Sequence, residues 1–220
     1  TDKNYRSIEM LTDSMIDYYD ETGVIFGMND SCESRAVGVH LMDPRYDLAY
    51  RLYQKPAYLS LLKTIRPEDR DLCFGVAQLS DTPHEKKDPY REAVIAEVAG
   101  IALLHSNAPK RSADQQYQVT LKSGILGGAH GHYDRLALNS MRRFGKSFYN
   151  PENVWYAYHT FMYKFYVQNS LTHNMTVVDL KQQDPAPTKT LACVSEKEYQ
   201  YIVQEIRTKW CQPPYGGWRV

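Results

Sequence analysis

The hydrophobic spacing changes part-way along the chain, and this change constrains the fold more than any other feature. Up to about residue 75, apolar side chains recur every three or four positions, as in Ile8, Leu11 and Met15, which predicts amphipathic helices. From Gln116 to Lys122 polar and apolar residues alternate, which is typical of a strand with one buried face. Helices followed by strands predict an α+β protein with a mainly antiparallel sheet.

Charge and proline crowd the segment between the two patterns, residues 78–92, which predicts a linker or a long surface loop. We therefore expect a helical domain at 1–77 and an antiparallel β domain at 93–220. The segment after Ser195 fits either a capped helix or a strand, because a capping-box pattern overlaps an alternating one. Four further segments are predicted to form strands: Val94–Leu104, Leu136–Asn139, Phe161–Val167 and Met175–Leu180.

Bulk composition argues against two classes of function. The 26 basic and 26 acidic side chains cancel, so the chain has no long-range attraction for polyanions and we expect no nucleic-acid partner. The longest apolar stretch, Ala93–Leu104, contains Glu97 and is shorter than the roughly 20 residues that span a bilayer, so we expect no membrane span.

The cysteines form no Cys-x-x-Cys pair, so we expect buried thiols or at most one disulfide. They are Cys32, Cys73, Cys193 and Cys211.

Two histidines lie in one glycine-rich segment, Gly127–Arg135, which reads Gly-Gly-Ala-His-Gly-His-Tyr-Asp-Arg. On a strand, His130 and His132 would share a face, and Gly131 between them would leave room for a ligand to approach. A third histidine, His173, precedes a β-branched run and could complete a site with them, because zinc takes three or four N, O or S ligands. The simpler interpretation of each is a hydrogen-bonded structural histidine.

Aromatic residues crowd residues 148–166, and the whole chain has 18 tyrosines. A tyrosine offers a flat apolar face and a polar tip, which suits a sugar ring and a half-buried strand equally well. Packing in a sheet or an interface is the simpler interpretation of most of them. A basic patch fits either sulfate groups or a solvated strand end. Its members are Arg135, Arg142, Arg143 and Lys146.

Two motifs together resemble the heparinase II/III-type polysaccharide lyases, a group that includes exolytic heparin or heparan sulfate lyases and oligoalginate lyases. The first is Gly-Gly-x-His-Gly-His-Tyr-Asp-Arg-Leu-Ala-Leu at 127–138, and the second is Phe-Tyr-x-x-x-Ser-Leu-Thr-His-Asn-x-x-Val-Val-Asp at 165–179. The resemblance is strongest over 124–179, and Phe26–Ser31 is similar to a loop between late helices of the family's first domain. It implies the C-terminal helices of an incomplete α/α toroid followed by an antiparallel β-sandwich. It also implies that the rest of the toroid, with part of the active site, is missing from these residues.

The resemblance implies cleavage beside a uronic acid by β-elimination. A base removes the proton on C5, the carboxylate carries the developing charge, and the bond at C4 breaks. Positioned donors must stabilise that charge for the step to proceed. The implied partner is an acidic polysaccharide, with heparin or heparan sulfate favoured by the basic patch and alginate next. The implied location is periplasmic or secreted.

The resemblance also implies roles for individual residues. His130 matches the histidine that faces the substrate, and we assign Tyr166 as the second catalytic group. The predicted substrate contacts are Arg135, Tyr158, Tyr163 and Asn174.

A structural metal, usually zinc, is implied at His132 and His173. The third ligand in the family is an aspartate, where this chain has Asn150. An amide is a neutral and weaker ligand than a carboxylate, so this departure weakens the case for zinc.

Two other interpretations remain open. The His-Gly-His-Tyr-Asp run also resembles the His-x-His-x-Asp-His of metallo-β-lactamase-type hydrolases, but Arg135 stands where the last histidine belongs, and a guanidinium is no metal ligand at neutral pH. The other is a non-catalytic carbohydrate-binding or structural β module that uses the tyrosine-rich segment as a stacking platform.

Overall fold

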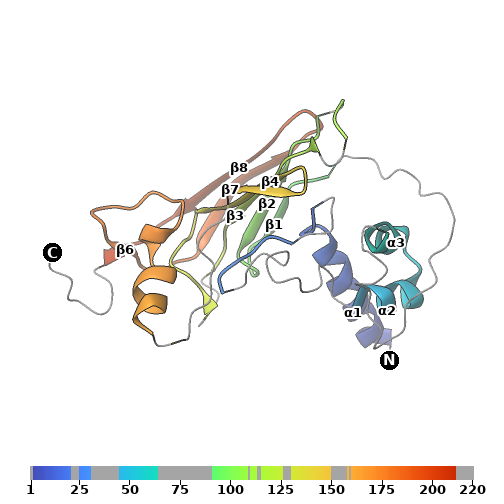
Figure 1. Ribbon diagram of the computed structural model, residues 1–220, viewed down its shortest axis with the longest axis horizontal. Helices are drawn as coiled ribbons and strands as arrows, with labels where there is room; N and C mark the ends of the chain where they lie inside the picture. Colours follow the sequence, from blue (N-terminus) through green and yellow to red (C-terminus); the bar gives the residue numbers. More distant parts are fainter. Residues whose placement is uncertain are drawn as a thin grey trace. The chain divides into compact units, whose positions relative to one another are not determined.

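The computed structural model describes residues 2–20, 25–30, 45–63, 91–108, 110–112, 115–125, 130–149, 158 and 160–211. Within these residues the protein is α+β, with a few helices and mostly antiparallel strands (Figure 1). The chain divides into two compact units, a helical unit of residues 1–26 and 33–89 and a β unit of residues 27–32 and 90–220. Residues 78–90 of the predicted linker lie outside the described residues.

The helical unit contains α1 (Asp2–Ile16), α2 (Arg45–Tyr53) and α3 (Pro56–Leu62). Its core is rich in tyrosine, and the Tyr46 and Tyr58 rings meet edge to face at 5.6 Å. The Tyr46 hydroxyl donates to the backbone oxygen of Thr12 at 2.8 Å, which satisfies the one polar atom of this buried ring. None of the described helices is long and apolar enough to cross a membrane.

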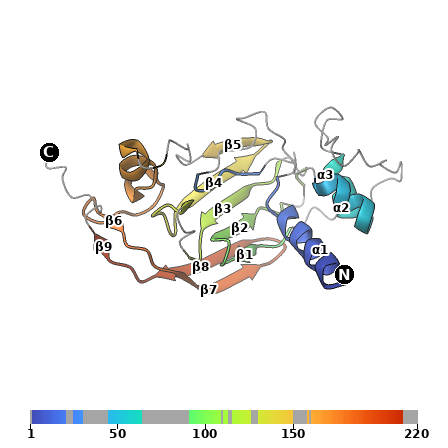
Figure 2. The same ribbon diagram turned by 90° about the horizontal axis from the view of Figure 1, so that it is seen from below.

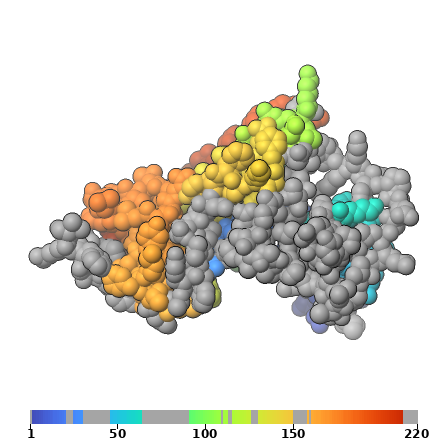
Figure 3. Space-filling view, in the orientation of Figure 1, coloured from blue at the N-terminus to red at the C-terminus, as the bar shows by residue number. Residues whose placement is uncertain are grey.

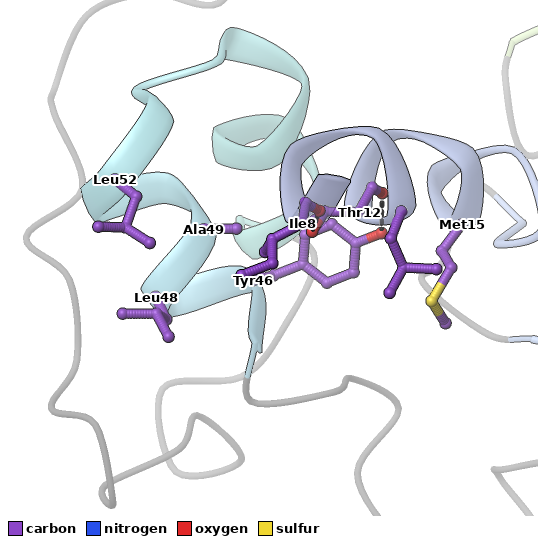
Figure 4. Close-up of a pocket in the computed structure, with 8 residues that line it drawn as sticks. Ile8, Thr12, Met15, Tyr46, Leu48, Ala49 and Leu52 are labelled. Carbon is purple, nitrogen blue, oxygen red and sulfur yellow. Dashed lines mark hydrogen bonds between the residues drawn. The ribbon is translucent and has the colours of Figure 1, made fainter. Parts of the chain in front are cut away.

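A cavity of about 290 Å³ lies between α1 and α2, with Tyr46 at its floor (Figure 4). The side chains around it are almost all apolar: Ile8, Leu11, Thr12, Met15, Tyr46, Leu48, Ala49 and Leu52. The apolar residues that recur along α1 therefore line this cavity as well as packing against the core.

The β unit is built on a five-stranded antiparallel sheet in which each strand pairs with the next along the chain (Figures 1 and 2). Its strands are β1 (Val94–Ala96), β2 (Ile101–His105), β3 (Gln118–Lys122), β4 (Leu138–Arg143) and β5 (Lys146–Tyr149). A hairpin of β7 (Thr188–Ser195) and β8 (Gln200–Ile206) and a short pair of β6 (Gln182–Gln183) and β9 (Trp210–Cys211) follow.

Side-chain hydrogen bonds attach the β7–β8 hairpin to the five-stranded sheet. The Ser195 hydroxyl accepts from the backbone N–H of Ala93 at 2.9 Å, and Gln204 donates to the Ser123 hydroxyl at 2.6 Å. Gln200 Oε1 likewise accepts from a backbone N–H of β2 at 2.7 Å. These bonds pair partly buried polar groups where the hairpin meets the sheet.

Two predicted strands are wrong. Phe161–Val167 forms a π-helical turn over Tyr163–Val167, because its aromatic residues also recur at a spacing of four, and the rings of Phe161 and Phe165 lie 4.3 Å apart. Met175–Leu180 is irregular, since Asp179 and Leu180 have φ of 53° and 54°, which no strand residue adopts.

Other predictions are corrected in detail. Val94–Leu104 is two strands joined by a turn at Glu97–Gly100, and the strand predicted from Leu136 begins at Leu138. The segment after Ser195 is a tight turn into β8, so its alternating pattern rather than its capping pattern describes it. Cys193 and Cys211 are exposed free thiols instead of buried ones, and the other two cysteines lie outside the described residues.

Gly124 is required where the end of β3 passes the β1–β2 turn. Its φ is +65°, and a Cβ atom there would lie 1.7 Å from the backbone oxygen of Glu97. We expect Gly124→Ala to lower the free energy of unfolding by at least about 3 kcal/mol, because left-handed strain adds to a clash that only backbone movement relieves. Gly100→Ala, whose Cβ meets nothing closer than 3.0 Å, is expected to cost less. Urea unfolding measures both, and equal losses would contradict the expectation.

Candidate functional site

A buried carboxylate, Asp30, gathers four side chains around it in the β unit. Its side chain is 9% exposed and lies in the segment that precedes the sheet by some 60 residues of chain. Its partners are His130 Nδ1 at 2.7 Å, His132 Nε2 at 3.0 Å, the Tyr163 hydroxyl at 2.8 Å and the Tyr158 hydroxyl at 3.2 Å. We call Asp30, His130, His132, Tyr158 and Tyr163 the Asp30 cluster.

Strands β3 and β4 hold the segment that carries Asp30. Lys122 on β3 donates to the side-chain oxygen of Asn29, which has a left-handed φ of 54°. Asn139 on β4 donates to the backbone oxygen of Gly27 at 2.9 Å. Asn29 tolerates the left-handed conformation, so the chain can reverse at this residue and direct the side chain of Asp30 into the cluster.

The ionisation of Asp30 follows from these contacts. Burial by itself would raise the pKa of its carboxyl group, but hydrogen bonds from His132, Tyr163 and His130 outweigh burial and hold the pKa below its usual value. Burial and the neighbouring carboxylate raise the pKa of Tyr163, which therefore stays a hydroxyl donor. At neutral pH the cluster contains a carboxylate that accepts from its neighbours.

His130 is the most exposed member of the cluster, with a side chain that is 64% exposed, and Tyr158 beside it is also exposed. Its Nδ1 is the nitrogen that lies next to Asp30, and the same atom is 2.7 Å from the Tyr158 hydroxyl. The Nε2 edge of the ring is therefore the edge available to a molecule in solution.

A second group lies deeper, next to the Asp30 cluster. Ligand atoms of His132, Asp134 and His173 all lie within 4.8 Å of one another, and all three residues are buried. His132 Nε2 is turned to Asp30, and His173 Nε2 donates to the backbone oxygen of Val167 at 3.1 Å. The Nδ1 atoms of both rings are buried without a hydrogen-bond partner among the described residues. We call these three residues the His–Asp–His group.

Burial lowers the pKa of both histidines in this group. The pKa of His173 falls to about 4, with burial the largest cause and Asp134 partly opposing it. The pKa of His132 is lowered for the same reason, against the raising effect of Asp30. Both rings are therefore neutral at pH 7, each with one nitrogen lone pair free to bind a cation.

Two cations of the chain already share the carboxylate of Asp134. Arg135 Nη2 lies 2.9 Å from Oδ1, and Lys122 Nζ lies 3.6 Å from Oδ2. Burial lowers the pKa of Lys122 to about 8, with Asp134 partly opposing it. The negative charge of Asp134 is thus balanced within the chain.

The His–Asp–His group fits a divalent metal by the chemistry of its donors. Two unpaired imidazole nitrogens and a carboxylate within 4.8 Å of one another match the ligand types that zinc takes. The predicted ligands His132 and His173 are brought together here, while the third predicted ligand, Asn150, lies outside the described residues. The carboxylate of this group belongs to Asp134, which was not among the predicted ligands.

Comparison with known proteins gives a match at the level of structure. No protein-family model matches the chain, and no curated protein matches it significantly. Among solved structures, the heparinase III BT4657 gene product matches with a TM-score of 0.64 at 14% identity, covering 93% of this chain and 28% of that chain. The chain has a heparinase III-like fold. A form of that protein with methylated lysines (TM-score 0.60, 14% identity) and another heparinase III (TM-score 0.58, 13% identity) agree.

The coverage is unequal in these comparisons. The chain spans 27% to 29% of the length of the heparinase III structures that it matches, while 89% to 93% of its own length is matched. It therefore corresponds to one part of a heparinase III-like protein.

The heparinase III-like fold brings some of the predicted substrate contacts to the site. Tyr158 and Tyr163 both reach Asp30. Asn174 is exposed and pairs through its backbone with Leu138 at the start of β4, so its segment lies beside β4 and β5, as the orange and yellow surfaces of Figure 3 show. Tyr166 is 45% exposed on the π-helical turn and is not among the described residues bonded to Asp30.

Arg135 is placed differently from its predicted role. Its guanidinium is 2% exposed and donates to Asp134 and to the backbone oxygens of Ser123 and Ile125, at 3.0 and 2.7 Å. These donors tie Asp134 to the loop around Ser123 and Ile125, and the described structure gives the guanidinium no exposed edge of note.

Sequence reasoning missed Asp30 and Lys122. Asp30 lies 100 residues from His130 along the chain, and no spacing rule connects them. The available signal was the similarity of Phe26–Ser31 to a loop of the lyase family, which points to the segment without giving the role of its aspartate. Lys122 looks like the polar side of an alternating strand, yet it is 1% exposed.

Proposed function

We propose that this chain forms part of a polysaccharide lyase that cleaves uronic-acid-containing glycans by β-elimination. Heparin or heparan sulfate is the favoured substrate and alginate the next. The observation that carries the proposal is an exposed histidine held by a buried carboxylate, within a cluster of tyrosine hydroxyls, on a heparinase III-like fold. Since such polymers occur outside the cytoplasm, we propose a periplasmic or secreted location.

His130 is the proposed acid–base group. With Nδ1 bound to Asp30, Nε2 is free to take the C5 proton of a uronate, and the imidazole ring is the side chain best suited to proton transfer near neutral pH. The leaving oxygen at C4 needs a proton in return. Tyr166, predicted as the second catalytic residue, is exposed on the π-helical turn and is one proposed source of this proton. Tyr158 is the alternative, because its hydroxyl lies 2.7 Å from His130 Nδ1.

His130→Gln is expected to lower the elimination rate by roughly 10²- to 10⁴-fold, because an amide cannot exchange the C5 proton. The proposed lyase, with this chain as one part of it, and its His130→Gln variant are incubated separately with heparan sulfate, heparin and oligoalginate, and the ultraviolet absorbance of the unsaturated product is followed. Saccharide affinity, measured by calorimetry, is expected to change little.

The matched control is Tyr201→Phe, an exposed tyrosine on β8. It is expected to leave rate and affinity unchanged. Cleavage without an unsaturated product would contradict a lyase, and saccharide binding that survives His130→Gln with no elimination in either protein would favour the carbohydrate-binding alternative.

We propose that the His–Asp–His group holds a structural zinc ion. His132, Asp134 and His173 would bind it, and the ion would fix the two rings and the carboxylate behind the Asp30 cluster. The unpaired Nδ1 atoms of the two histidines support this assignment.

The metal-free protein is expected to bind about one zinc ion per chain, since the group offers a single set of ligands. His173→Gln is expected to abolish this binding, because an amide replaces an imidazole donor while the side chain keeps a similar size. Titration with Co²⁺, followed by visible absorption, and metal analysis after dialysis measure both. A metal content that does not differ between the two proteins would contradict the site.

A further inference from the structure

We propose that Asp30 fixes the tautomers of two histidines at once, so that His130 presents Nε2 outward and His132 presents Nδ1 to the His–Asp–His group. The proposal makes Asp30 a positioning residue that links the exposed and buried parts of the site. Its meaning for catalysis rests on the proposed lyase function, but the hydrogen-bond assignment stands on geometry alone.

The first step concerns His130. An ionised carboxylate only accepts hydrogen bonds, and Asp30 Oδ2 lies 2.7 Å from His130 Nδ1, so that nitrogen must carry the proton. The Tyr158 hydroxyl is also 2.7 Å from Nδ1 and 3.2 Å from Oδ2. If this hydroxyl donated to Nδ1, two lone pairs would face each other across the short contact with Oδ2. The hydroxyl therefore donates to Asp30, and Nδ1–H points between the two oxygens.

The second step concerns His132, for which the assignment is reversed. Asp30 Oδ1 lies 3.0 Å from His132 Nε2, so Nε2 carries the proton. The ring is fully buried, and its Nδ1 has no hydrogen-bond partner among the described residues. That lone pair lies in the His–Asp–His group. The ring centroids of His132 and His173 are 5.1 Å apart in this group. One carboxylate thus selects opposite tautomers in two histidines that are separated by a single glycine.

The third step is that Asp30 cannot turn away. The Tyr163 hydroxyl lies 2.9 and 2.8 Å from its two oxygens and is itself held by Gln168 Nε2 at 3.0 Å. The backbone before Asp30 is tied to β4 through Asn139 and Gly27. A carboxylate that is fixed in this way orients both rings before any ligand binds, which is how an outer group prepares a metal ligand or a proton-transfer group.

The experiment is a long-range ¹H–¹⁵N correlation spectrum of the histidine rings in the unmodified protein, with His130→Gln and His132→Gln used for assignment. The spectrum is recorded at about pH 8.5, above the ordinary histidine pKa of about 6.5. The expected result is Nδ1–H for His130 and Nε2–H for His132. If His130 carries its proton on Nε2, the proposal is overturned without any variant of Asp30.

A second measurement uses Asp30→Asn, whose amide has one acceptor oxygen for two histidines. His130 is expected to shift toward the Nε2–H form that imidazole prefers in water, and the affinity for Co²⁺ alone is expected to fall by roughly 10- to 100-fold. The control Tyr201→Phe, at the exposed tyrosine on β8, leaves Asp30 and its partners in place and is expected to retain both tautomers. Unchanged tautomers and unchanged Co²⁺ affinity in Asp30→Asn would refute the proposal.

These readouts require no substrate. If His130 carries its proton on Nδ1 and His132 on Nε2 but the protein shows no elimination activity, the lyase function is refuted and the role of Asp30 is supported. Elimination activity together with Nε2–H on His130 would refute the role of Asp30 and leave the lyase function in place.

Discussion

Asp134→Ala is expected to lower the free energy of unfolding by about 3–5 kcal/mol, measured by urea unfolding of the metal-free protein near pH 7. Asp134 is 2% exposed and lies between Arg135 at 2.9 Å and Lys122 at 3.6 Å, both of which are also buried. Without this carboxylate the buried guanidinium of Arg135 would lose its ion-pair partner, and Lys122 would lose the group that opposes the effect of burial on its pKa. The penalty is the cost of burying this unpaired charge rather than the strength of any one contact.

The control is Asp179→Asn, since Asp179 has a left-handed φ of 53° that asparagine also tolerates. Asp179 also forms an ion pair, with Lys181 at 3.2 Å, but its side chain is 70% exposed. A surface pair of this kind contributes less than about 1 kcal/mol, so the control is expected to lose little. Similar losses in the two variants would show that the charges around Asp134 are better hydrated than their burial indicates.

Acidification of the metal-free protein from pH 7 to pH 4 is expected to lower its stability by about 3 kcal/mol through His173 alone. In the unfolded chain this histidine binds a proton below about pH 6.5, whereas in the folded protein burial lowers its pKa to about 4. The unfolded state therefore takes up more protons between these two values. Its contribution to stability is complete above the unfolded pKa and is lost as the pH falls toward the folded one.

The comparison for this prediction is His173→Gln, which does not titrate and keeps a donor for the backbone oxygen of Val167. Urea unfolding is measured from pH 7 to pH 4 in the presence of a chelator. The stability of the variant is expected to depend less steeply on pH than that of the unmodified protein. His132, whose pKa is also lowered by burial, adds to the slope of both proteins equally. Parallel curves would contradict the prediction.

The fold class could be predicted from the sequence because hydrophobic spacing is a local property. Ile8, Leu11 and Met15 lie on one face of α1, and the alternation of Gln118–Lys122 corresponds to the strand β3. The alternation did not give the buried face, because the buried side chains of β3 are the polar ones, Gln118, Thr120 and Lys122. The method failed at Phe161–Val167, where the aromatic residues satisfy a spacing of two and a spacing of four. The packing of Tyr163 and Val167, both buried, selected the helical form there.

The candidate site divides in the same way. Its histidines could be found because imidazole is a rare and chemically distinctive side chain, and the two motifs that carry them are local. The carboxylates that orient them could not, since Asp30 and Asp134 are two among many acidic residues and only their contacts distinguish them. The burial of Arg135 was equally hidden from the sequence, because a basic side chain next to a histidine motif looks available to a sulfate until its contacts are known.

The sequence by itself determined that helices precede a mainly antiparallel sheet, and it located three histidines with the chemistry for proton transfer or metal binding. Only the tertiary structure decided which nitrogen of each ring is free, since that depends on Asp30 arriving from a segment 100 residues away. The physical reason is that side-chain periodicity acts between neighbours along the chain. A hydrogen-bonded carboxylate acts through space, once β3 and β4 have fixed the segment that carries it.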